Sequence, residues 1–133
     1  DNGLITFYTK DGDEIKSFAT GDEIRMLAET PAAQNTEDVL AASYNGYVYR
    51  FSCDGELRWS TALPSPVLLI APLPGGAVAA GTAGGEVAVL DATGAIRSLK
   101  TFNGAIADLL PGDGKLTVAT ANGEIAELAL PAR

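Results

Sequence analysis

The sequence lacks histidine and holds only one cysteine among its 133 residues. Without histidine, the Ser-His and Cys-His nucleophile pairs are excluded, as are most zinc sites. One cysteine cannot form a disulfide within the chain. No apolar run approaches the roughly 18 residues that a membrane-spanning helix needs. The run VLLIAPL at 67–73 is interrupted by Pro72, so we expect no membrane insertion.

Basic residues are also few, with 9 lysines and arginines against 17 acidic residues and a net charge of −8. Residues 1–56 hold 11 of the acidic and 4 of the basic side chains. Nucleic acids and anionic membranes bind proteins through clustered lysine and arginine, so neither is an expected partner. The excess of acidic residues in 1–56 indicates either solvated strand edges and loops or a face that attracts a basic partner.

Glycine is abundant, and four glycines recur at spacings of 43, 39 and 38 residues: Gly3, Gly46, Gly85 and Gly123. Each closes an Asn-Gly or Gly-Gly pair, and such pairs supply the positive φ angles of a two-residue hairpin turn. A second glycine follows three of them after nine residues: Gly12, Gly55 and Gly94. The sequence therefore predicts two successive hairpins at a fixed register in each repeat.

The segments between the turns are short, rich in β-branched residues and without helical periodicity. A repeat of about 40 residues with four antiparallel strands, A to D, is typical of a β-propeller blade. A β-sandwich would not need a repeat at nearly constant spacing. We predict one all-β domain over 1–133, with about three blades. Its parts are strands C and D at 2–19, full blades at 24–61 and 67–101, and strands A to C at 106–130.

The segment GYVYRFSCDGELRW at 46–59 resembles the repeat of the PQQ-like, or quinoprotein-type, propeller family. The copy at 85–99, GEVAVLDATGAIRSL, follows the same pattern. In that family a tryptophan near the end of the repeat docks on the neighbouring blade, and here it is present once, as Trp59. Ser17 and Ser98 stand at the corresponding places of the other copies. WD repeats are a more distant relation, because their Gly-His and Trp-Asp signatures are absent.

The resemblance implies one of two functional classes. Quinoprotein enzymes of the family use a bound quinone with Ca²⁺, a catalytic aspartate and a vicinal disulfide, which one cysteine cannot form. Non-catalytic members are scaffolds for protein assembly. We therefore expect a non-enzymatic scaffold with an unidentified protein partner and with no catalytic, cofactor or metal residues. The alternative is a cofactor- or ligand-binding propeller with its site at the central channel.

The number of blades is unusual, because propellers close with about four to eight blades. Three blades leave apolar end faces open, which is an aggregation hazard. One solution is self-association, in which a homodimer completes a ring of six or seven blades. In that arrangement strands C and D of one copy join strands A and B of the other, and one strand C is redundant. The other solution is that the chain is a piece of a longer propeller.

Aromatic residues cluster in the second repeat. Tyr44 and Tyr47 flank a turn glycine and are the candidate protein-contact residues, because tyrosine is enriched in binding hot spots. Arg50 alternates with the aromatics and is predicted to pair with a carboxylate of an adjacent blade. The family resemblance favours a periplasmic or exported protein, although no targeting segment is visible in the sequence.

Overall fold

The computed structural model describes residues 3–29 and 38–130, which fold almost entirely into short β-strands. The strands are β1 (Leu4–Tyr8), β2 (Glu14–Ala19), β3 (Ile24–Glu29), β4 (Val39–Ser43), β5 (Tyr47–Phe51), β6 (Leu57–Ala62), β7 (Val67–Pro72), β8 (Val78–Thr82), β9 (Glu86–Leu90), β10 (Ile96–Thr101), β11 (Ile106–Pro111), β12 (Lys115–Thr120) and β13 (Ile125–Ala129). A single 3-10 turn, η1 (Pro74–Gly76), joins β7 to β8.

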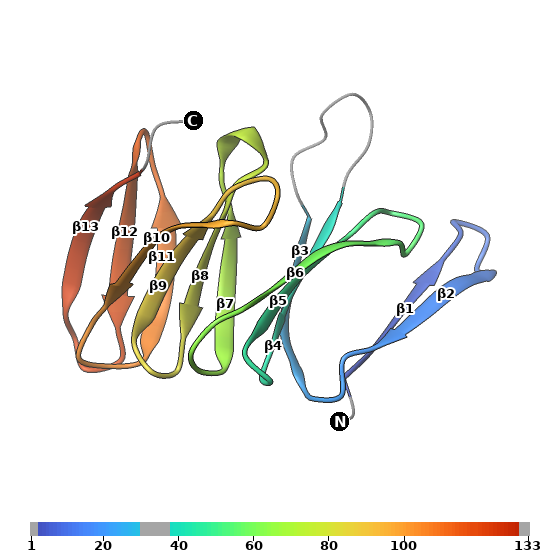
Figure 1. The fold of residues 1–133 in the computed structure, drawn as a ribbon, viewed down its shortest axis with the longest axis horizontal. Coiled ribbons are helices and arrows are strands. Elements are labelled where there is room, and N and C mark those ends of the chain that lie inside the picture. The colour runs from blue at the N-terminus through green and yellow to red at the C-terminus, as the bar shows by residue number, and fades with distance from the viewer. Residues whose placement is uncertain (1–2, 30–37, 131–133) are drawn as a thin grey trace.

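These strands form four antiparallel sheets in which sequence neighbours pair (Figure 1). They are the hairpin β1–β2, the four-stranded sheets β3–β6 and β7–β10, and the three-stranded sheet β11–β13. The inner strand β7 contacts both β3 and β11, so the sheets pack face to face in chain order. The prediction of an all-β fold built from four-stranded antiparallel blades is confirmed. The described sheets do not close into a ring.

The burial of each strand follows its position in the sheet. Every residue of β8 is buried, and β4 is nearly so, because these strands have a packed sheet on both faces. Their small side chains, VLAAS and VAAGT, allow the neighbouring sheets to approach closely. All six residues of β10 are exposed, since it is an outer strand.

Three apolar clusters fill the spaces between successive sheets. Phe7 of the hairpin packs on Phe51 of the next sheet, with ring centroids 5.5 Å apart. The first cluster holds Ile5, Phe7, Ala41, Tyr49 and Phe51. The second holds Leu40, Ala42, Val48, Leu63, Val67, Ile70, Val78, Ala80, Ala88 and Leu90. The third holds Ala71, Leu73, Ala79, Val87, Val89, Ile106, Leu109, Leu116 and Val118.

Two of the loops that carry a repeat glycine, at 44–46 and 83–85, are one residue longer than the sequence predicted. Three residues, 44–46, separate β4 from β5, and the Gly46 N–H donates to the Ser43 carbonyl at 3.1 Å. The glycine then takes a φ of +92° as the last loop residue, which is the usual form of a three-residue hairpin. Asn-Gly occurs in both two-residue and three-residue hairpin loops, so the dipeptide alone does not determine the loop length. All seven repeat glycines have positive φ.

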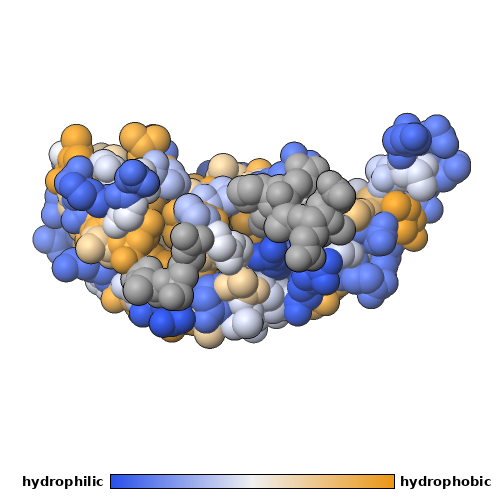
Figure 2. Space-filling view, turned by 90° about the horizontal axis from the view of Figure 1, so that it is seen from above, coloured by the Kyte–Doolittle hydropathy of each residue, from blue (hydrophilic) through white to orange (hydrophobic). Residues whose placement is uncertain are grey.

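Seen from above, the sheets follow a curved band, with the β1–β2 hairpin reaching out at the right-hand end (Figure 2). Orange, apolar surface gathers towards the left-hand end, which β11–β13 form. Across the described residues, no helix has the length and apolar character required to span a membrane.

Candidate functional site

The first open surface lies on β3, beside the hairpin. Leu27 of β3 is 54% exposed, whereas Ile70 and Leu109, which hold the same place in the next two sheets, are 2% and 6% exposed. Ile70 and Leu109 are covered because an inner strand pair of the preceding sheet packs on them. The hairpin β1–β2 has only the two outer strands, so it leaves Leu27 uncovered.

The second open surface is the outward face of β11–β13. Ile125 of β13 is 74% exposed, although the equivalent Val48 and Val87 are 0% and 1% exposed. Leu110 of β11 is 64% exposed and takes the place of Ala71, which is buried in the preceding sheet. Each end of the chain therefore exposes apolar positions that the repeat buries elsewhere.

The predicted contact residues Tyr44 and Tyr47 are both exposed, at 44% and 38%. They lie at the β4–β5 hairpin, and the Tyr47 ring stacks on Tyr49 with centroids 5.7 Å apart. The Asn45 amide donates to the Thr20 carbonyl at 3.0 Å and to the Tyr49 hydroxyl at 3.1 Å. These bonds hold the hairpin against the β2–β3 loop, so the two tyrosines stand on an ordered support.

Trp59 lies where two sheets meet. Its indole N–H donates to the Ala92 carbonyl at 3.0 Å, on the β9–β10 turn of the following sheet. The ring lies so close to Gly94 that a Cβ there would stand 2.6 Å from it. At the preceding junction Phe7 and Lys16 lie against Gly55 in the same way. Trp59 thus joins sheet β3–β6 to sheet β7–β10.

Arg50 makes a second junction between these sheets, at the end that carries η1. Its Nε donates to Asp38 at 2.7 Å, and its Nη1 donates to the Gly76 carbonyl at 2.8 Å. Arg58 also pairs with Asp38, at 2.8 Å. The predicted ion pair with an adjacent blade is therefore wrong in one respect. The carboxylate belongs to the same sheet, and the neighbouring sheet supplies a backbone carbonyl.

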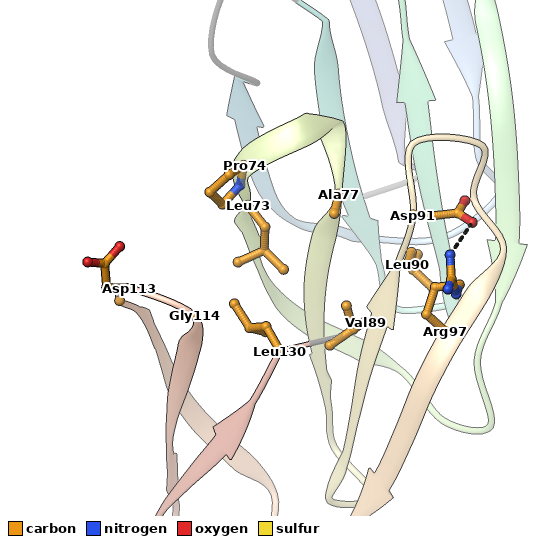
Figure 3. A pocket seen from close by; sticks show the side chains of 11 residues that line it. Leu73, Pro74, Ala77, Val89, Leu90, Asp91, Arg97, Asp113, Gly114 and Leu130 are labelled. Carbon is orange, nitrogen blue, oxygen red and sulfur yellow. Dashed lines mark ion pairs between the residues drawn. The ribbon is translucent and has the colours of Figure 1, made fainter. Parts of the chain in front are cut away.

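A cleft of about 360 Å³ occupies the corresponding place between sheets β7–β10 and β11–β13 (Figure 3). Leu73 and Val89 are buried side chains in its wall, and Leu130 closes it from the opposite side. Its polar residues are Asp91 and Arg97 on one wall, with Asp113 at the rim. The cleft was not predicted from the sequence. Comparing repeat positions would have indicated it, because Ala77 and Val89 replace Asp38 and Arg50.

Two carboxylates are held in their ionised form: Asp91 beside the cleft and Glu86 at the other end of β9. The Thr93 hydroxyl, which donates to Asp91 at 2.6 Å, lowers the pKa of that carboxyl. The Thr82 hydroxyl has the largest effect and lowers the pKa of Glu86; burial opposes it with the next largest effect, and the Ser65 hydroxyl adds a smaller lowering. Within the described ranges, no group of three or more aspartate, glutamate or cysteine side chains is placed to hold a metal ion. Cys53 is exposed.

Comparison with solved structures identifies the fold. The crystal structure of the computationally designed Ika4 protein superposes with a TM-score of 0.81 at 18% identity, covering 98% of this chain and 81% of that one. BamB from Moraxella catarrhalis gives a TM-score of 0.73 at 21% identity, covering 96% of this chain and 39% of that one. BBS1N, crystallised in complex with ARL6DN, gives 0.71 at 20% identity, covering 96% and 44%.

No protein-family model matches the sequence, and no curated protein matches it either. The chain spans about two fifths of BamB and of BBS1N, both of which are β-propellers. At these identities the likeness concerns the fold alone. The four sheets, their antiparallel order and these superpositions together show that the chain has a β-propeller fold whose described sheets do not close into a ring.

Proposed function

We propose that the chain is a non-enzymatic scaffold of the PQQ-like propeller type that acts after two copies complete one ring. The ring binds another protein through its loops. The proposal rests on one observation: the two ends of the chain leave exposed apolar positions that the repeat elsewhere buries against each other. Leu110 is equivalent to Ala71, and Leu27 is equivalent to Leu109. Ala71 and Leu109 share one buried cluster.

Joining two copies end to end would therefore bring Leu110 of one copy onto Leu27 of the other. The inner strands β11 and β12 of one copy would lie beside β1 and β2 of the next. This supplies the inner strand pair that the hairpin lacks, and it gives six blades for two chains. Both leucines lose exposed apolar surface in this arrangement, which favours association by roughly 25 cal/mol for each Å² buried.

One strand is redundant in the joined blade, because β1 and β13 compete for the place beside β12. The burial of their side chains indicates which of the two strands is displaced. Ile5 and Phe7 anchor β1 against the next sheet with 7% and 8% exposure, whereas no residue of β13 is fully buried. We therefore expect β1 to keep its place and β13 to be displaced.

The completed ring would present its hairpin loops at two ends, where a protein partner docks on a rigid support. Tyr44 and Tyr47 are the proposed contact residues, because they are exposed and their hairpin is fixed by Asn45. Such aromatic side chains lose little conformational entropy on binding, which makes them effective anchors.

The end-to-end contact is tested with charge substitutions measured by sedimentation equilibrium. We expect Leu27→Lys and Leu110→Glu each to weaken self-association by tenfold or more, because each places an unpaired charge in an apolar contact. The double variant places opposite charges together and should regain much of the lost affinity. Leu99→Lys is the matched control, since Leu99 is 48% exposed on the outer strand β10. Equal masses for all variants, or no recovery in the double variant, would contradict the proposal.

A further inference from the structure

The cleft between sheets β7–β10 and β11–β13 corresponds to a place that the preceding junction fills with its own arginine. Val89 holds the repeat position of Arg50, and Gly114 holds that of Gly76. At the preceding junction the Arg50 guanidinium crosses the gap and donates to the Gly76 carbonyl. At this junction Val89 is too short to cross, and the cleft remains. The fold thus contains a filled copy and an open copy of one site.

We propose that this cleft binds the arginine side chain of a partner protein, with the guanidinium taking the place that Arg50 takes in the preceding junction. The buried side chains of Leu73 and Val89 suit the methylene stem of an arginine, which packs well on apolar surface. A volume of about 360 Å³ is at the lower end of ligand clefts, which hold about 300–1,000 Å³.

The polar groups of the cleft favour a cation over an anion. Arg97 faces Asp91 at 3.7 Å, so these two opposite charges offset each other. Asp113 then supplies the remaining charge at the rim, where no described residue forms an ion pair with it. The carboxylate that binds Arg50 comes from Asp38, whose place Ala77 takes here. Asp113 replaces that charge on the opposite wall.

The backbone supplies the second acceptor. The Gly114 carbonyl already accepts the Leu130 N–H at 3.0 Å. A carbonyl oxygen has two lone pairs, so the Gly114 oxygen can accept one more N–H. The Gly76 carbonyl accepts the Arg50 guanidinium in the same way. A guanidinium offers five N–H donors in a planar fork, so it can bond to this carbonyl while its charge is attracted by Asp113 at the rim.

Leu73, Val89 and Gly114 belong to one chain and lie outside β13, so the site that they form persists in the proposed ring even where Leu130 leaves with β13. It extends the scaffold proposal by giving the chemistry of a partner, namely a protein segment with an accessible arginine. A monomer that still binds the arginine peptide would overturn the ring but not the arginine site. A dimer that does not bind the peptide would overturn the arginine site but not the ring.

The experiment titrates the full chain with the peptide acetyl-Gly-Arg-Gly-amide and follows backbone amide shifts by NMR. We expect saturable shifts at Val89 and Gly114, with a dissociation constant on the order of 1 mM for a single side chain. The same peptide with citrulline in place of arginine is neutral and nearly isosteric, and it should bind at least fivefold more weakly. Acetyl-Gly-Glu-Gly-amide tests the opposite charge.

Two variants separate the cleft from other acidic surface. Val89→Arg together with Ala77→Asp copies the Arg50–Asp38 pair into the cleft, and we expect it to abolish peptide binding. Asp113→Asn removes one rim charge from an exposed residue and should weaken binding three- to tenfold without disturbing the fold. Asp54→Asn, on the exposed β5–β6 turn, is the charge-matched control. Unsaturable shifts, equal binding of citrulline, tighter binding of the glutamate peptide, or unchanged binding to the filled variant would each overturn the proposal.

Discussion

Arg50 provides the sharpest test of how the sheets are held together. Arg50→Val removes the bonds from its guanidinium to Asp38 and to the Gly76 carbonyl, at 2.7 and 2.8 Å. Hydrogen bonds to charged groups contribute roughly 1.5–3 kcal/mol each. Asp38 is 8% exposed at its side chain and keeps Arg58 at 2.8 Å, which limits the cost of leaving it buried. We therefore expect a loss of about 2–4 kcal/mol in the free energy of unfolding.

The next sheet, β7–β10, suggests how to recover that loss. Asp38→Ala combined with Arg50→Val copies Ala77 and Val89, the apolar pair that the next sheet uses at these positions. Replacing a buried ion pair with apolar residues is often neutral, whereas removing one partner is costly. The double variant should therefore be at least about 1 kcal/mol more stable than Arg50→Val alone.

The assay is urea unfolding at one fixed protein concentration, followed by the fluorescence of Trp59, the only tryptophan of the chain. Arg97→Val is the control, because Arg97 is 51% exposed and lies 3.7 Å from its partner. An exposed pair of that length contributes less than about 0.5 kcal/mol. The reasoning is refuted if Arg97→Val costs as much as Arg50→Val, or if the double variant is no more stable than the single one.

Two further predictions concern Glu86 and β13. The folded-state pKa of Glu86 lies below its usual 4.5 because of the Thr82 hydroxyl, so its stabilising effect is present above that pH and is lost as the pH falls below it. Glu86→Gln should therefore lose less thermal stability than the parent chain between about pH 5.5 and 3.5, and equal losses would contradict this. A chain ending at Gly123 lacks β13 and should still form a dimer by light scattering, provided that its circular dichroism remains that of a β protein. A folded monomer would show that β13 holds the copies together.

The sequence indicated the sheets because every strand carries its own local evidence. Alternating apolar residues and the recurring glycines determine where strands lie and where they turn, and both depend on near neighbours in the chain. The longer hairpin loops escaped prediction because Asn-Gly fits either loop. Their length depends on the hydrogen bond from Gly46 to Ser43, which the dipeptide does not specify.

The site was harder to predict because it depends on contacts between sheets. The partners of Arg50 come from Asp38, twelve residues away, and from Gly76, twenty-six residues away on another sheet. The cleft arises where Val89 stands in place of an arginine, so it is visible only when repeats are compared position by position. The exposure of Leu27 likewise follows from strands that its neighbouring sheet lacks.

The central claim is that two copies complete one ring, and the mass of the unmodified chain in solution tests it most directly. Size-exclusion chromatography with light scattering, run at several concentrations, should give about twice the chain mass of 13.7 kDa. Dissociation to a monomer should begin only on dilution. A folded monomer of 13.7 kDa at every concentration would contradict the account.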